Sequence, residues 1–334
     1  MRGNRKDKIS VVEATYAPAH TEKGWLTGIL DAAGPLICEG MGAAAYVYEG
    51  AEGAVRIGAR VAHGLDYPLD DFVLPIETLP PAFLDRTWRS LSFGMCSDVI
   101  PVSEMPQAKP LHDAGIRDVV NINAYDASGF GVCIGVPLPA ERRRRPREEE
   151  TWTRVAAHLA SAYRLFRRST LLPSPEAATA VLDPKGRLQH AADGETADRI
   201  RASLESAVLR MERARGAMRR TDPDEALGLW RTLVDSELTL LDHFERGGKR
   251  YVVAVANPPR EEGGHSVLSR RERQVVAAAA SGRSNKLIAY ELGLAHSTVR
   301  VLLARAAHRL HAKSREELVA IHRAHERARL APKS

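Results

Sequence analysis

The chain contains 334 residues, 44% of them hydrophobic and 27% charged, which is ordinary for a globular protein and long enough for two or three domains. Its net charge is +6, but residues 265–334 hold 14 Lys and Arg against 5 Asp and Glu, so this segment is +9 and the rest is −3. A polyanion partner is therefore expected at the C-terminal segment and not elsewhere. The sequence has no apolar run of about 20 residues and no apolar signal core, so we expect a cytoplasmic protein without a membrane partner.

The first part of the chain alternates helical and strand-like patterns. Residues 1–23 are expected to be a tail whose first ten residues are frayed, and residues 24–170 to be one domain. The expected elements are a helix at 25–38, strands at 44–48 and 55–62, a helix in the second half of 75–89, strands at 119–124 and 131–136, and a helix at 148–168. By fold-level analogy, this order fits a GAF-like sensory domain.

An antiparallel sheet with covering helices commonly encloses a ligand pocket, so a small-molecule ligand is a candidate partner. The candidate lining residues are Tyr46, Tyr48, Phe93, Met95, Cys96, Asn121, Asn123 and Tyr125. For any single one of these residues, simple core packing is the commoner interpretation. The cysteines Cys38, Cys96 and Cys133 show no metal-ligand spacing, and we expect no metal or cofactor and buried thiols.

A second mixed pattern occupies residues 174–258. Strands are expected at 178–182 and 188–191, helices at 197–217 and from Asp222 to about Val234, and a closing hairpin at 238–244 and 251–256. About 80 residues of this kind suggest a small PAS-like α+β domain, and residues 259–264 then form a linker rich in Gly, Glu and Pro. The GGK run at 247–249 lacks the remaining residues of a phosphate-binding loop, so an ATP-dependent regulator is not indicated.

The segment from Leu268 to Leu310 predicts three short helices. Ser269 and Glu272 have capping-box spacing, Gly282 ends the first helix, Ser284 caps the second, and Gly293 permits a sharp turn before the third. In the third helix the expected buried stripe is Val299, Leu302, Leu303, Ala306 and Leu310. Two small helices followed by a basic, exposed third helix describe a helix-turn-helix, rather than a solvated helical hairpin.

These residues closely resemble the C-terminal DNA-binding domain of LuxR-type transcriptional regulators over roughly residues 265–325. The family's Leu-Thr-x-Arg-Glu opening is met by Leu268, Ser269, Arg271 and Glu272. Its Gly-x-Ser-Asn-Lys-x-Ile-Ala core is met by Gly282, Ser284, Asn285, Lys286, Ile288 and Ala289, and its Thr-Val-Lys/Arg by Thr298, Val299 and Arg300. The resemblance implies a fourth helix from about Ser314 that helps to make a dimer contact.

The match has departures. Ala295 stands where the family usually has a Ser or Thr N-cap, a loss worth about 1 kcal/mol that Ser297 could partly offset. Leu302 and Ala306 replace the family's usual His and Ile, which indicates a repacked core. A sigma-factor-like promoter reader has a similar helix ending and stays an alternative.

The expected architecture is an α+β sensory region, GAF-like and then PAS-like, followed by an all-α tetrahelical helix-turn-helix domain at residues 265–328. The expected function is a sequence-specific DNA-binding regulator, a homodimer that contacts double-stranded DNA and RNA polymerase. The expected base contacts are Arg300, Val301 and Ala304, and the expected phosphate contacts are Ser284, Asn285, Lys286, Ser297, Thr298 and Arg305. The helices at 148–168 and 314–325 are candidate dimer contacts.

Two classes compete with this interpretation. A GAF-like domain could instead be a thiol-dependent enzyme, such as a methionine-sulfoxide reductase fused to a DNA-binding module, with Cys96 or Cys133 as the nucleophile. A protein-binding scaffold is the second alternative, and the localised charge of +9 counts against it. We expect a regulator rather than an enzyme.

Overall fold

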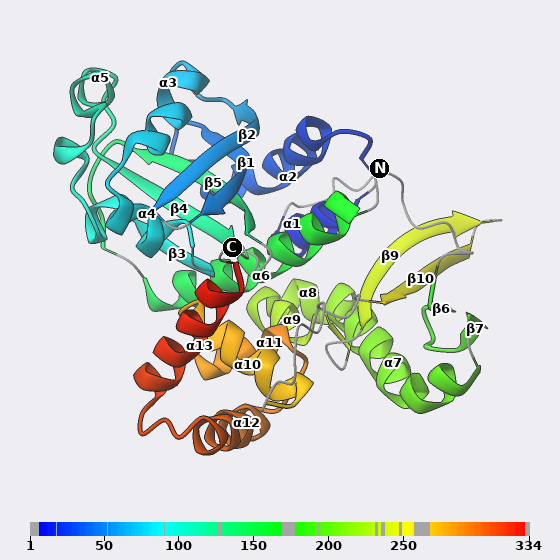
Figure 1. Cartoon of the computed structure of the whole chain (residues 1–334). Helices are drawn as coiled ribbons and strands as arrows, with labels where there is room; N and C mark the ends of the chain where they lie inside the picture. Colours follow the sequence, from blue (N-terminus) through cyan, green and yellow to red (C-terminus); the bar gives the residue numbers. More distant parts are fainter. Residues whose placement is uncertain are drawn as a thin grey trace.

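A computed structural model describes residues 7–17, 19–51, 53–89, 91–125, 129–143, 145–168, 178–192, 194–230, 233–234, 238–246, 249–256 and 268–330. These residues form two antiparallel sheets with their helices and a separate group of four C-terminal helices (Figure 1). The expected linker at 259–264 lies outside the described residues.

The first sheet contains five antiparallel strands in the order β2-β1-β5-β4-β3. The strands are β1 (Ala43–Ala51), β2 (Ala54–His63), β3 (Leu91–Met95), β4 (Asp118–Tyr125) and β5 (Phe130–Leu138). Along β4 every residue is buried, whichever face of the sheet it points to. The sheet is therefore covered on both sides, which requires a helical layer on each.

One layer consists of three longer helices, α1 (Lys8–Thr15), α2 (Glu22–Ile37) and α6 (Pro146–Arg168). They share a core with the inward-facing residues of the strands, and Trp25 of α2 stacks on Tyr163 of α6 with ring centroids 5.5 Å apart. The expectation of a frayed N-terminus is wrong from Lys8 onward. Asp7 caps α1, and Ile9 and Val12 are fully buried, because α2 and α6 provide the apolar surface that the local sequence lacks.

The other face of the sheet is covered by short elements. These are α3 (Leu69–Val73), η1 (Leu74–Thr78), α4 (Pro81–Thr87), η2 (Cys96–Asp98), η3 (Val102–Glu104) and α5 (Ala108–Asp113). Their apolar residues form a second core with Tyr46, Tyr48 and Cys133 of the sheet. The helix expected in the second half of 75–89 is confirmed as α4, whereas β3 and most of the short elements were not predicted.

The second sheet has the order β7-β6-β10-β9-β8, the same permutation of its strands as in the first sheet. It contains β6 (Ala180–Leu182), β7 (Leu188–Ala191), β8 (Leu233–Val234), β9 (Leu238–Arg246) and β10 (Lys249–Ala256). Its helices are α7 (Gly194–Arg215), α8 (Ala217–Thr221) and α9 (Pro223–Leu229). The helix expected to run to Val234 ends at Leu229, because Trp230 adopts an extended conformation and β8 follows.

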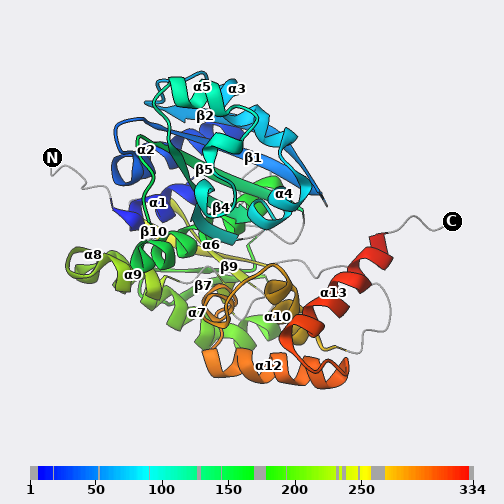
Figure 2. The same cartoon turned by 90° about the vertical axis from the view of Figure 1, so that its left-hand side faces the viewer.

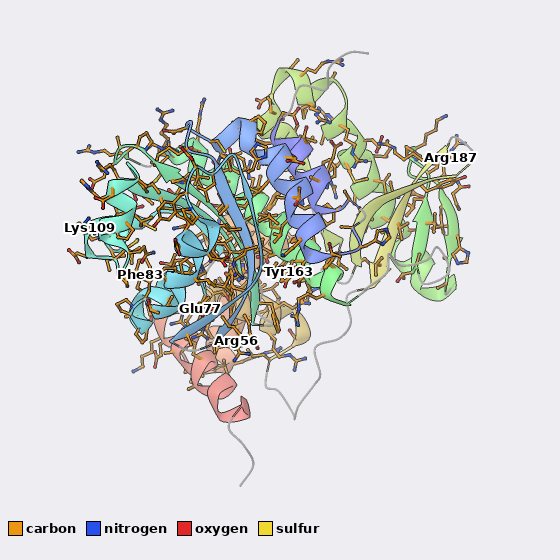
Figure 3. The ribbon with its side chains drawn as sticks, turned by 90° about the horizontal axis from the view of Figure 1, so that it is seen from above. Arg56, Glu77, Phe83, Lys109, Tyr163 and Arg187 are labelled. Carbon is orange, nitrogen blue, oxygen red and sulfur yellow. The ribbon has the colours of Figure 1, made fainter. Side chains whose placement is uncertain are left out.

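Helix α6 lies at the centre of the molecule. Figure 3 places Lys109 of α5 and Arg187, in the turn between β6 and β7, at opposite edges, with Tyr163 of α6 between them. Val155, Ala156 and Leu159 of α6 are fully buried. These residues are therefore not available for the dimer contact that the sequence suggested for this helix.

The C-terminal group contains α10 (Arg270–Ala280), α11 (Asn285–Glu291), α12 (His296–Arg309) and α13 (Arg315–Leu330). In Figure 2, α12 lies along the lower edge of the molecule and α13 rises at its right-hand side. Among the described residues, no single helix has the length and apolarity to cross a membrane; α11 and α12 meet the test only as a pair, and they are bent by 109°.

Candidate nucleic-acid interface

The first helix of the C-terminal group begins with the expected capping box. The backbone N–H of Glu272 donates to Ser269 Oγ at 3.3 Å, and the backbone N–H of Ser269 donates to Glu272 Oε2 at 2.8 Å. Glu272 is almost fully buried and also pairs with Arg309 at the end of α12, with 2.6 Å between Oε2 and Nη1. The same carboxylate therefore caps α10 and ties it to α12.

The four helices share one small apolar core, separate from the two upstream cores. It consists of Leu268, Val275, Val276, Ala278, Ala279, Ile288, Ala289, Leu292, Val299, Leu303, Ala306 and Leu318. Gly282 and Gly293 have φ values of 79° and 66°, which favour glycine and allow the turns on either side of α11. Leu302 and Leu310, expected in the buried stripe of α12, are only partly buried.

Helix α12 presents most of its expected recognition face to solvent. Arg300, Ala304 and Arg305 are exposed, and Val301 keeps 48% of its surface accessible, an unusual exposure for a valine. Ser297 and Thr298 are exposed in the first turn. The helix begins at His296 with Ala295 as an N-cap that makes no side-chain hydrogen bond, so Ser297 does not take over the capping position. All six candidate contacts on α12 are therefore accessible to an incoming duplex.

The three candidate phosphate contacts before and within α11 are held by protein groups. Ser284 caps α11 by accepting the Leu287 backbone N–H at 3.2 Å. The Asn285 side chain accepts a hydrogen bond from Arg315 at 2.5 Å. Lys286 forms an ion pair with Glu150 of α6. The structure thus divides the candidate DNA contacts into an open set on α12 and an engaged set at α11.

Three arginines outside the motif positions support the turns of this domain. Arg283 is buried and pairs with Glu291 at 2.6 Å, and it donates to the backbone carbonyl of Tyr125 in β4 at 3.1 Å. Arg315 donates to the Arg283 carbonyl at 2.5 Å, and Arg323 to the Ala280 carbonyl at 2.6 Å. The sequence analysis missed these roles because a guanidinium that caps a backbone carbonyl from another element leaves no local pattern.

The candidate ligand-pocket residues do not lie on one face of the first sheet. Phe93 and Met95 belong to the core under α2 and α6. Tyr46, Tyr48, Cys96 and Tyr125 belong to the core under the short elements, and Asn121 and Asn123 bond to members of that group. A pocket on either face would therefore lack some of the proposed residues.

The polar groups on the second of these faces satisfy one another. The Tyr48 hydroxyl donates to the Trp88 carbonyl at 2.7 Å and also lies 2.9 Å from Asn123 Oδ1, and the Trp88 indole N–H donates to Tyr46 Oη at 3.0 Å. Packing around them is tight: a Cβ added at Gly131 would lie 2.1 Å from the Tyr48 ring. These hydrogen bonds and close contacts fix the positions of Tyr46, Tyr48 and Trp88 on this face.

The two buried cysteines are poorly suited to nucleophilic chemistry. Burial raises the pKa of the Cys96 thiol to about 12, and it raises the pKa of the Cys133 thiol to about 12 as well. Asn121 contacts both sulfur atoms, at 3.0 Å from Cys96 Sγ and 3.7 Å from Cys133 Sγ. Because the thiolate is the reactive form, this buried environment disfavours nucleophilic chemistry at both thiols.

The helices α10 to α13 define a class of protein module, the tetrahelical helix-turn-helix, in which a short helix and a sharp turn position an exposed basic helix. Residues 266–322 match the family model described as bacterial regulatory proteins, luxR family, and this segment is a LuxR-type DNA-binding domain. The match supports a transcription regulator and gives no support to the sigma-factor or thiol-enzyme alternatives. No curated protein matches the chain.

Proposed function

We propose that the protein is a sequence-specific transcription regulator in which α12 enters the major groove of double-stranded DNA. The observation that carries the proposal is the exposed face of α12, with Arg300, Val301 and Ala304 accessible in a domain of a DNA-binding family. Arg300 offers paired donors that fit the O6 and N7 acceptors of guanine, while Val301 and Ala304 would contact base edges.

The phosphate contacts would come from both sides of the turn between α11 and α12. Ser297, Thr298 and Arg305 flank the base-reading residues on α12, and Ser284, Asn285 and Lys286 lie at the start of α11. Such contacts position a domain on the duplex without reading its sequence. The excess positive charge of residues 265–334 supports this assignment.

Replacing Arg300 with Ala tests base reading. A duplex is first selected from random DNA with the full chain, and binding is then measured on this duplex and on random DNA. We expect a loss of about 1 to 3 kcal/mol on the selected duplex and little loss on random DNA. Arg187→Ala, the same change at an exposed residue on a distant edge, is the matched control. Equal losses on both duplexes would remove the base-reading role of Arg300.

Dimerisation is part of the proposal, and α13 is its candidate surface. Glu316, Glu317, Ala320 and Arg323 of this helix are exposed, and it lies at the periphery of the domain (Figure 1). Sedimentation of the full chain on a selected duplex should give two protein chains per duplex. A single chain on a duplex long enough for two half-sites would contradict the dimer. A contact with RNA polymerase from the same domain is also proposed.

The upstream region would receive the signal. Two antiparallel sheets with the same strand order and covering helices support a GAF-like domain at 24–170 and a PAS-like domain at 174–258. The proposed input is a small molecule that binds within the first sheet domain. At Tyr48 such a ligand would meet a side chain that is bonded to Asn123 and closely packed on Gly131.

A further inference from the structure

Helix α11 is shared between the DNA-binding domain and the upstream region. Its Ile288 and Ala289 face the core of the C-terminal domain. Tyr290, by contrast, is a member of the large upstream core, and Leu287 packs against the same core. Only 8% of Tyr290 is accessible, so one side of α11 is buried by elements outside its own domain.

Tyr290 belongs to a buried chain of hydrogen bonds that joins α1, α6 and α11 to Trp230, the residue after α9. Tyr16 Oη of α1 lies 3.2 Å from His158 Nδ1, and His158 Nε2 lies 2.7 Å from Tyr290 Oη. The Tyr290 hydroxyl donates toward the backbone carbonyl of Trp230 at 2.7 Å. Because that uses its one proton, His158 must donate from Nε2 and accept at Nδ1 from Tyr16. This direction is consistent with a neutral His158, whose pKa burial lowers to about 3.

Near the start of α11, charged groups surround the contact between Tyr290 and His158. Lys286 is paired with Glu150, and Glu150 is also 2.7 Å from Arg154. The Arg154 guanidinium lies over the Tyr290 ring, 5.6 Å from its centroid. The pKa of the Glu150 carboxyl is lowered, chiefly by the Lys286 hydrogen bond, so the group is an anion at neutral pH.

The two sides of the DNA-binding domain therefore differ. The recognition face of α12 is exposed and α12 lies along the lower edge of the molecule (Figure 1), whereas α11 is held against α6 by Tyr290 and Lys286. A duplex can approach α12 in this arrangement. A phosphate that approached Lys286 would meet the Glu150 carboxylate, a like charge already bound to the same ammonium group.

We propose that α6 restrains the DNA-binding domain through α11, with the Glu150 carboxylate standing at Lys286 in place of a DNA phosphate, so that tight DNA binding requires α11 to separate from α6. The proposal rests on the proposed function, because it takes Lys286 as a phosphate contact. The restraint acts by charge competition at one edge of the interface and leaves the base-reading helix open. Its strength depends on the upstream region, since α1, α6 and Trp230 together form the seat of Tyr290.

The test compares full-length Glu150→Gln with the wild type on a selected duplex over a series of salt concentrations. We expect about a fivefold or greater gain in affinity at low salt. The slope of log K against log salt should also become steeper by up to about 0.9. In the wild type, a DNA phosphate that binds Lys286 releases a cation, but the Glu150 carboxylate that Lys286 leaves takes up a cation, so the two changes cancel. The variant has no carboxylate at position 150, and only the release remains. Glu141→Gln, the same change at an exposed residue before α6, is the control and should match the wild type.

Tyr290→Phe provides a second, independent variant. It removes the hydroxyl that joins His158 to Trp230 and leaves the apolar core of the C-terminal domain unchanged. We expect this variant also to raise DNA affinity. Backbone hydrogen exchange should become faster in the segments of α6 and α9 that contain or adjoin His158 and Trp230. If the wild type binds the selected duplex through Arg300 and neither variant differs from Glu141→Gln, the restraint is refuted and the proposed function stands. If neither the wild type nor the variants select any duplex from random DNA, both the restraint and the proposed function are refuted.

Discussion

The clearest single prediction concerns the missing cap of α12. Ser269 and Ser284 cap the two preceding helices with backbone angles of φ −63°, ψ 160° and φ −69°, ψ 156°. Ala295 has φ −72° and ψ 147° at the equivalent position of α12, but its methyl group cannot accept a hydrogen bond. The backbone is therefore already arranged for a cap, and Ala295→Ser requires only the added oxygen.

Because an N-cap Ser in place of Ala typically stabilises a helix by about 1 kcal/mol, Ala295→Ser should slow hydrogen exchange of the α12 backbone about fivefold. Hydrogen exchange measured peptide by peptide on the full chain separates this helix from the upstream domains. Ala304→Ser, an exposed position in the middle of α12, is the control, and it should be neutral or slightly destabilising. If both variants had the same effect, the gain could not be assigned to capping.

Two further predictions follow from buried groups. Burial holds the pKa of His158 near 3 against 6.5 in the unfolded chain, so below pH 6.5 the unfolded state binds the extra proton and this group lowers stability by about 1.4 kcal/mol per pH unit, down to about pH 3. Denaturant unfolding should therefore show the stability gap between wild type and His158→Gln shrinking as the pH falls; a constant gap would contradict the buried neutral imidazole. A thiol reagent at neutral pH should label the half-buried Cys38 before Cys96 or Cys133, as intact mass would show, and faster labelling of Cys96 would reopen the thiol-enzyme alternative.

The DNA-binding domain was predictable because its signals are local. Ser269, Ser284, Gly282 and Gly293 each act within one turn of their own position, so the spacing along the chain contains the information. The absence of a capping side chain at Ala295 could be predicted from the sequence for the same reason. The contacts of α11 were not predictable, because the partners of Tyr290 lie 132 and 60 residues away in the chain.

In the upstream region, more of the structure depends on contacts between residues that are distant in the sequence. The long helix and most strands follow from periodicity, but α1 does not. The polar residues Lys8, Ser10 and Glu13 interrupt its apolar pattern, and the burial of Ile9, Val11 and Val12 depends on distant partners. The candidate lining residues divide between the two faces of the first sheet. The sequence did not show which strand residues share a face, so it did not reveal that Phe93 and Tyr48 would face opposite layers.

The position of α1 has a consequence for how the chain is assembled. Arg219 donates to Asp7 and to Ser10 at 2.7 Å each, and Lys8 pairs with Asp224 at 2.8 Å, across sequence separations of 209 to 216 residues. During synthesis the first helix is made long before these partners emerge. Because contacts between such distant residues are slow to form, we expect α1 to reach its final place only after the second sheet domain has been translated, so the earliest part of the chain completes its folding among the last.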